Sequence, residues 1–277
     1  MIAELLLGSI CLCGEAPERW NDFYWENDHV GFRAYGPGDK HKWSGIDVFN
    51  KCVSTNVVVH WLRHHSSPNF HLNRGQGMDD YAVGPGRGVG GVALRKDGKW
   101  LPDYGNWVKY RIITNSDERC AFELDYKLPI GGTMTLGFEL RRGRSLFTET
   151  VSFSADAPME GVEVGVGLDV NPKRRHHGSL IVDEKNLLVS LFEDPYGKKG
   201  EEGSLMSAAI LHPAFGENDV LSVCDGPSGE KMLMTSPRSP EGRVGKIVVS
   251  AGADWTEAGR FRTAEAWHNY VRTEKER

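Results

Sequence analysis

The chain has 277 residues, of which 39% are hydrophobic and 26% charged, and its mean hydropathy is -0.42. This composition is typical of a globular protein with a substantial core, and the length suits one large all-β domain. A formal net charge of -5 and a pI near 6.1 leave no overall basic field, which argues against nucleic acid or an anionic membrane surface as a partner.

The first 19 residues form an apolar N-terminal segment that begins MIAELLLGSICLCG. Its apolar run is too short to span a bilayer, and Glu4 stands where a secretory signal carries positive charge. We interpret residues 1–19 as a remnant of an export signal and residues 20–277 as a single domain. The five Cys form no CxxC pair, which favours buried thiols over disulfides or a zinc knuckle.

Short apolar runs recur along the rest of the chain, separated by turn-forming residues. Phe122, Leu124 and Tyr126 alternate with charged residues, which is the period-two pattern of a half-buried strand. Asp97-Gly98 predicts a tight hairpin turn. The predicted strand-like runs are Val57–Leu62, Trp107–Thr114, Ala121–Leu128, Thr133–Leu140, Leu146–Ser154, Gly161–Leu168, Leu187–Phe192, Leu205–Leu211, Lys231–Thr235 and Gly245–Ala251.

One helix is predicted, at the C-terminal end. Thr263 is a suitable N-cap, and Trp267, Tyr270 and Val271 follow at helical spacing. The fold class is therefore all-β, a large antiparallel β-sandwich with a short C-terminal helix. The sandwich type shared by sugar mutarotases and several polysaccharide lyases fits this pattern, and a propeller or jelly roll also fits the number of strands.

Chemically versatile side chains are concentrated in one loop-like segment, His71–Gly91, with the sequence HLNRGQGMDDYAVGPGRGVGG. His71 can act as a general base or acid near neutral pH, and Tyr81 offers a phenol for proton transfer. Asp80 can orient a histidine, and the fork of Arg87 matches a carboxylate. Each of these residue types alone has a common structural role. The hypothesis of a site therefore depends on their occurring together within this one short segment.

Residues on both sides of this segment, and one within it, extend this hypothesis. Four aromatic residues and one acid are candidates for substrate binding, because aromatic rings match the apolar face of a sugar, although core packing is the simpler role for them. They are Trp25, Tyr35, Trp43, Asp79 and Trp107.

Neither a phosphate loop nor a defined metal motif is present. The glycines of GPGRGVGG are not followed by GK[ST] or by a helical pattern, and no HExxH motif occurs. We therefore predict no cofactor. If a divalent metal is bound, the candidate ligands are His60, His64 and His71.

Four stretches resemble the domain-of-unknown-function family 4861: WENDHVGFRAYGP (Trp25–Pro37), SGIDVFNK (Ser44–Lys51), the His71–Gly91 segment, and AGADWTEAGRF with AEAWHNY near the end. The resemblance covers nearly the whole chain after about Trp20. One departure is Gln76, which stands where relatives usually carry an acidic residue.

The resemblance implies a carbohydrate-active protein. Family members occur beside, or fused to, hydrolases of unsaturated uronic-acid sugars in bacterial polysaccharide-degradation loci, and some resemble oligosaccharide dehydratases. We therefore expect an enzyme that eliminates water or an alkoxide across C4–C5 of a uronate in an oligosaccharide. His71 and Tyr81 would be base and acid in an order that stays open, with Asp80 orienting and Arg87 binding the carboxylate.

Two other functions remain open from the sequence. A non-catalytic carbohydrate-binding protein would depend on the aromatic residues and not on His71, and a metal-dependent hydrolase or epimerase would depend on a bound ion. The family context implies a periplasmic or extracellular location in a bacterium, while a cytoplasmic location also stays open. The oligomeric state is not predicted.

Overall fold

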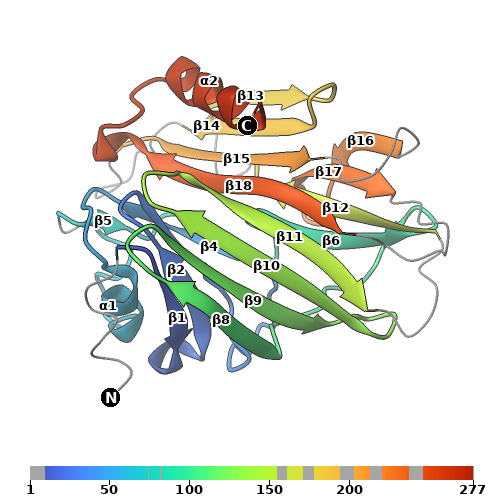
Figure 1. Cartoon of the computed structure of the whole chain (residues 1–277), viewed down its shortest axis with the longest axis horizontal. Helices are drawn as coiled ribbons and strands as arrows, with labels where there is room; N and C mark the ends of the chain where they lie inside the picture. The colour runs from blue at the N-terminus through green and yellow to red at the C-terminus, as the bar shows by residue number, and fades with distance from the viewer. Residues whose placement is uncertain are drawn as a thin grey trace.

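The computed structural model of the chain describes residues 10–73, 75–81, 83–154, 161–170, 178–193, 203–212, 220–236 and 246–276. Their strands form three antiparallel sheets, so the protein is the mostly β, antiparallel sandwich that the sequence predicts. Two five-stranded sheets lie behind one eight-stranded sheet in the view of Figure 1.

The N-terminal sheet has five strands in the order β1-β2-β3-β4-β5. Its first strand lies within the expected N-terminal segment, so residues 12–16 contribute an edge strand to the folded domain, while residues 1–9 lie outside the described residues. The strand-like runs predicted from sequence begin only at Val57, so the first four strands of this sheet were not predicted. The strands are β1 (Leu12–Ala16), β2 (Asp22–Glu26), β3 (Val30–Ala34), β4 (Ile46–Lys51) and β5 (Gly77–Met78).

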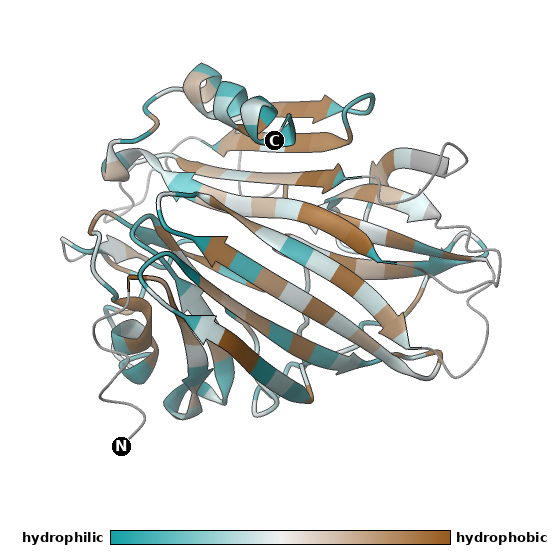
Figure 2. Ribbon diagram, viewed as in Figure 1, coloured by the Kyte–Doolittle hydropathy of each residue, from teal (hydrophilic) through white to brown (hydrophobic). Residues whose placement is uncertain are grey.

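The largest sheet has eight strands in the order β13-β14-β15-β18-β11-β10-β9-β8. Most of them coincide with the predicted runs; the start of the last run, Gly245, lies outside the described residues. Figure 2 shows hydrophobic and hydrophilic residues alternating along several of these strands, as expected for a sheet with one buried face. The strands are β8 (Lys109–Asn115), β9 (Arg119–Lys127), β10 (Thr133–Arg141), β11 (Leu146–Ser154), β13 (Gly178–Asp183), β14 (Leu188–Glu193), β15 (Leu205–His212) and β18 (Ile247–Trp255).

The third sheet has the order β16-β17-β12-β6-β7. The turn between β6 and β7 is the predicted hairpin, with Asp97 at φ 50° and Gly98 at φ 76°. A parallel bridge between Ile46 and Gly88 joins this sheet to the N-terminal sheet, and the Ile46 amide donates to the Arg87 carbonyl over 3.1 Å. The strands are β6 (Val89–Lys96), β7 (Lys99–Trp100), β12 (Val162–Leu168), β16 (Val220–Asp225) and β17 (Lys231–Ser236).

The main core lies between the N-terminal sheet and the eight-stranded sheet, and it is rich in aromatic rings. Three of the ring pairs across the two sheets have centroids 4.5 to 5.1 Å apart, a separation at which aromatic rings attract one another. These three are Phe23 with Phe122, Trp25 with Phe138, and Phe32 with Phe147. This rigid interior supports the outer face of the N-terminal sheet, where the candidate site lies.

Helix α1 (Val58–Arg63) overturns the strand predicted at Val57–Leu62. The cause is long-range capping, since the Glu26 carboxylate accepts hydrogen bonds from the amides of Val57 and Val58 over 2.9 and 3.0 Å. The β-branched run therefore receives at its N-terminus the acceptors that no local residue supplies. Val58 and Leu62, one turn apart, are buried against β1, β2 and β4.

Helix α2 (Ala264–Lys275) confirms the predicted C-terminal helix, with the Thr263 side chain accepting a hydrogen bond from the amide of Ala266. Trp267 and Val271 bury one face of α2 against β14 and β15 (Figure 1). Two short 3-10 helices, η1 (Pro17–Arg19) and η2 (Thr256–Ala258), complete the elements. Among the described residues no helix is long and apolar enough to cross a membrane.

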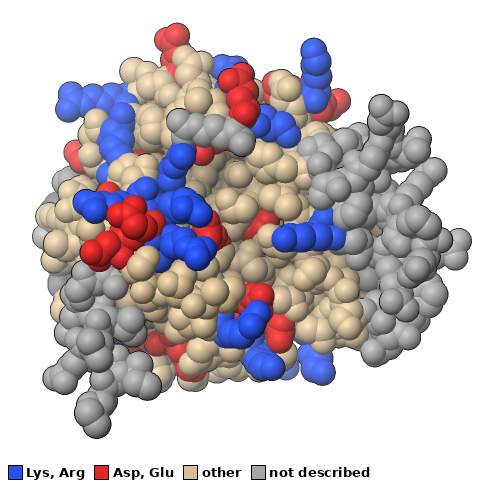
Figure 3. All heavy atoms as spheres, viewed as in Figure 1, with Lys and Arg blue, Asp and Glu red and all other residues tan. Residues whose placement is uncertain are grey.

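The visible face of the molecule carries charges of both signs close together (Figure 3). Near the ends of β9 and β10, Glu139 forms ion pairs with Arg119 and Arg141. The five cysteines are free, and three of them are buried, in agreement with the prediction of buried thiols.

Candidate active site

His71 is held in a defined orientation on an open surface. Its Nδ1 lies 2.9 Å from the carbonyl oxygen of Asp79 and 3.4 Å from Oδ2 of the same residue, and its side chain is 73% exposed. A carbonyl oxygen only accepts hydrogen bonds, so Nδ1 carries the proton in the neutral ring. The other nitrogen, Nε2, therefore bears a lone pair on a side chain that is open to solvent, which is the arrangement of a general base.

Asp79 itself is almost fully buried and belongs to a cluster of three acids around one guanidinium. Arg33 on β3 donates to Asp47 Oδ2 from Nε and Nη2, over 2.9 and 2.7 Å, and its Nη1 donates to Asp22 Oδ2 over 3.2 Å. The same Nη2 lies 3.9 Å from Asp79 Oδ2. The guanidinium also lies 5.0 Å from the ring of Tyr35. The cluster thus connects His71 to three strands of the N-terminal sheet.

The environment of the Asp79 carboxyl group favours its protonated form. Burial raises its pKa well above the usual range, the negative charge of Asp47 raises it further, and Arg33 opposes the shift only in part. With the neutral carboxyl favoured, an imidazolium that forms at His71 is stabilised mainly by the Asp79 carbonyl oxygen, 2.9 Å from Nδ1. Burial also raises the pKa of Tyr35, so this phenol stays protonated.

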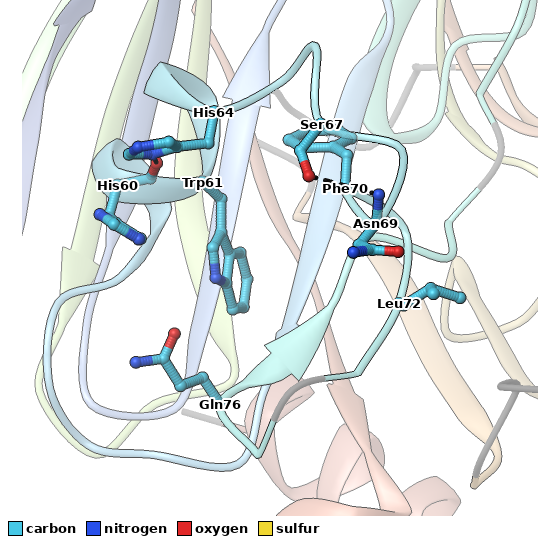
Figure 4. Close-up of a pocket in the computed structure, with 8 residues that line it drawn as sticks. All are labelled: His60, Trp61, His64, Ser67, Asn69, Phe70, Leu72 and Gln76. Atoms are coloured by element: carbon cyan, nitrogen blue, oxygen red, sulfur yellow. Dashed lines mark hydrogen bonds between the residues drawn. The ribbon is translucent and has the colours of Figure 1, made fainter.

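A half-open pocket of about 300 Å³ adjoins His71. Phe70 and Leu72, on either side of His71 in the chain, both line it, and the Phe70 and His71 rings lie 5.0 Å apart. Figure 4 shows Trp61 on α1 facing the pocket, with Gln76 below it and the Phe70 region opposite. A partly exposed indole with polar groups around it is suited to stack against a pyranose ring. The lining residues are His60, Trp61, His64, Ser67, Asn69, Phe70, Leu72 and Gln76.

Arg87 forms a second, separate centre at the seam of the two five-stranded sheets. Its Nη1 donates to Asp103 Oδ2 over 2.6 Å, and its side chain is 4% exposed. Glu230 closes the turn around it, because Oε1 accepts from the Arg87 amide and Oε2 from the Ser228 amide, over 2.9 and 2.8 Å. The guanidinium predicted to bind a substrate carboxylate is therefore already paired with a carboxylate of the protein.

The remaining predicted residues differ in how much surface they keep. Trp25 is fully buried in the core, and Tyr81 and Trp107 are 5% exposed, so these rings present almost no face to a ligand. Trp43 keeps partial exposure and stacks on His41, with ring centroids 4.6 Å apart. Among the predicted residues, the structure brings together His71, Asp79 and Tyr35, while Asp80 directly follows Asp79 and is partly buried.

A carboxyl group also lies inside the core, beside the glycine-rich segment. Glu149 on β11 is fully buried, and neither of its oxygens has a hydrogen-bond partner among the described residues. A Cβ placed on Gly90 would lie 3.3 Å from Glu149 Oε2 and 2.8 Å from Ala251 Cβ. Gly90 therefore allows β6 to approach the eight-stranded sheet closely, instead of opening space for a ligand.

The predicted metal ligands are only partly brought together. His60 and His64 lie on α1 with ring centroids 4.4 Å apart, whereas the Nδ1 of His71 is bound to Asp79. Within the described ranges, no group of three or more His, Cys, Asp or Glu residues is arranged to hold a metal ion.

Sequence reasoning missed Arg33, Asp47 and Asp22. A signal was present, because Arg33 interrupts the apolar run Val30–Ala34, and a cation in such a strand requires a buried partner. Its partners lie 11 and 14 residues away along the chain and meet it only through the pairing of β2, β3 and β4.

The chain matches the family Domain of unknown function (DUF4861) over residues 11–277, and it belongs to that family. It is 26% identical over 278 residues to the "Uncharacterized protein P7" of Formosa agariphila, an alignment that covers 94% of this chain. The chain spans 66% of the length of that relative.

Two solved structures are similar in architecture at low sequence identity. One is the heparan sulfate lyase HepC mutant from Pedobacter heparinus, with a TM-score of 0.47, 10% identity, and coverage of 88% of this chain and 36% of that one. The other is a heparinase III, with a TM-score of 0.46, 8% identity, and coverage of 89% and 36%.

Proposed function

We propose that this protein is a carbohydrate-active enzyme that eliminates water or an alkoxide across C4–C5 of a uronic-acid unit in an oligosaccharide. The observation that carries the proposal is His71, whose Nδ1 is anchored to Asp79 while Nε2 is left as an exposed base beside a sugar-sized pocket. The family resemblance, which implies uronate-containing substrates, supports the same reaction class.

In the proposed reaction, His71 Nε2 removes the C5 proton while the leaving oxygen departs from C4. The electron pair of the C5–H bond forms the C4–C5 double bond, and the pair of the C4–O bond leaves with the oxygen, which takes up a proton. As the imidazole becomes charged, the Asp79 carbonyl, 2.9 Å from Nδ1, stabilises it.

We propose that Tyr81 acts as the acid and that Arg87 binds the substrate carboxylate in exchange for Asp103, its partner in the free protein. Tyr81 follows Asp79 by two residues, and the buried Nε of Arg87 has no hydrogen-bond partner among the described residues. Both side chains are nearly buried, so we propose that they act only when a substrate reaches beneath the surface. The location proposed for the reaction is the periplasm or the outside of a bacterial cell.

The test is incubation with a panel of oligosaccharides that end in glucuronate, followed by ultraviolet absorbance of the new C4–C5 double bond. The wild type should produce this signal, and His71→Ala should lower kcat by about 10²–10⁴-fold. The matched control is His65→Ala, because His65 Nδ1 is likewise held by a carbonyl, that of Leu62, but the His65 ring packs against Trp20 instead of against Phe70 of the pocket. Absence of the signal across the panel, or full activity of His71→Ala, would overturn the proposal.

A second candidate, a non-catalytic carbohydrate-binding protein, is favoured by the pocket face of Trp61. It predicts that Trp61→Ala loses oligosaccharide affinity by calorimetry, that His71→Ala keeps it, and that no product appears. Turnover that is lost on chelation would instead point to the metal-dependent hydrolase or epimerase.

A further inference from the structure

Two histidines that the proposed reaction does not use face each other at the rim of the pocket. His60 and His64 lie one turn apart on α1, and their ring centroids are 4.4 Å apart with the planes tilted by 44°. Both are exposed and both line the pocket (Figure 4). The helix at this point, where a strand was predicted, is what places the two rings on one face.

The orientation of His64 is fixed by a hydrogen bond within the helix. Its Nδ1 lies 2.8 Å from the carbonyl oxygen of His60, so Nδ1 carries the proton and Nε2 is available as a ligand. Metal-binding histidines commonly have the second ring nitrogen held in this way by a carbonyl or carboxylate. His60 has no ring hydrogen bond to the part of the chain that the structure describes, so its ring can turn to meet the same ion.

Gln76, which lines the same pocket, offers an oxygen donor. The Gln76 backbone is fixed by the hydrogen bond from the Cys52 amide to its carbonyl, over 3.0 Å. In Figure 4 its side-chain amide points up toward α1, below Trp61 and His60. An amide oxygen is a neutral metal ligand, and it adds a third donor to the two nitrogens.

We propose that His60, His64 and Gln76 form a binding site for a divalent transition-metal ion such as Zn²⁺. Imidazole nitrogens select Zn²⁺, Cu²⁺ and Ni²⁺ over Mg²⁺ and Ca²⁺, which prefer oxygen ligands. At Zn–N distances of about 2.0–2.1 Å, two nitrogens on a tetrahedral ion are about 3.3 Å apart, a separation compatible with two rings whose centroids lie 4.4 Å apart when the His60 ring turns. Three donors leave a coordination position open toward the pocket, where water or a ligand oxygen binds.

The site differs from the one expected from sequence, because Gln76 replaces His71 as the third ligand. The inference stands apart from the proposed elimination, since it concerns binding of the metal alone.

The test is calorimetric titration of Zn²⁺ into the metal-free full chain at neutral pH, with Mg²⁺ titrated in parallel. We expect a Zn²⁺ site that His60→Ala and His64→Ala each weaken by about tenfold or more, and no comparable site for Mg²⁺. His65→Ala is the matched control, since it lies next to His64 but outside the pocket, and it should leave the affinity unchanged.

Gln76→Glu gives a test in the opposite direction. A carboxylate in place of the amide should tighten Zn²⁺ binding, because it adds a negative charge at the third ligand position. This gain cannot arise from a loss of folding. Failure of the wild type to bind Zn²⁺, unchanged affinity in the His60→Ala/His64→Ala double variant, or no tightening by Gln76→Glu would overturn the inference.

Discussion

The N-terminal sheet and the eight-stranded sheet share one core, but they place polar side chains in opposite ways. Strands β2, β3 and β4 are buried at every position, charged residues included. Strands β9 and β10 alternate between buried and partly exposed positions, so most of their charges face water. Buried charge has to be matched residue by residue, and this requirement gives the N-terminal sheet the fixed polar geometry from which a site can be built.

The largest effect is expected from removing the central cation of that geometry. Arg33→Met leaves the buried carboxyl groups of Asp22 and Asp47 without their guanidinium and should destabilise the protein by about 3–5 kcal/mol. Denaturant unfolding measures the change. In the eight-stranded sheet, Arg111→Ala breaks only an exposed pair with Glu123 and should cost about 0–1 kcal/mol. Equal losses for the two variants would break the comparison between the sheets.

A smaller effect is expected at Glu149 on β11, which is fully buried although most acidic and basic side chains of its sheet face water. Burial raises the pKa of Glu149 well above its usual range. The folded state therefore keeps a proton that the unfolded chain releases above pH of about 4.3, so the free energy of unfolding falls as the pH rises toward the folded-state pKa.

Glu149→Gln removes this dependence, and its stability advantage over the wild type should grow by up to about 1.4 kcal/mol per pH unit. Unfolding curves at a series of pH values measure it. Thr148→Ala, at the adjacent outward-facing position, should keep the wild-type slope. A constant difference between Glu149→Gln and the wild type at all pH values would show that the carboxyl group is ionised in the core.

The smallest change in stability is expected at helix α2, which packs on β14 and β15 of the eight-stranded sheet. Thr263→Ala removes the side-chain cap of α2 and should lower stability by about 1 kcal/mol, while Thr263→Ser should restore it. Helix α2 packs on the eight-stranded sheet, whereas the candidate site lies on the N-terminal sheet. Oligosaccharide binding should therefore be unchanged. A parallel loss of binding would show that the two regions are coupled.

The same contrast explains how much of the fold could be predicted from sequence. Strands such as β9 were predicted because one face is exposed and Phe122, Leu124 and Tyr126 alternate with charges. The N-terminal strands show no such alternation, since both faces are buried. Helix α1 was missed because its cap is Glu26, 31 residues before Val57, and no local pattern records that contact.

For the site, the sequence indicated a segment but not the contacts within the fold. The His71–Gly91 segment contains His71 and Asp79, which are eight residues apart and in contact. It could not indicate that Arg33 and Asp47 complete the cluster, because strand pairing brings them there. Nor could it show that Asp103 already neutralises Arg87, 16 residues away.

The bond from the Arg87 amide to Glu230 spans 143 residues of the chain, and the bond from Arg260 to the His29 carbonyl spans 231. Contacts between such distant segments form late and slowly in folding, because a long loop has to close first. During synthesis the Arg87 amide in the His71–Gly91 segment therefore cannot bond to Glu230 until the chain has been made as far as the start of β17. Until β18 follows, the eight-stranded sheet lacks the strand that joins β11 to β15, and the nascent chain is open to misassembly.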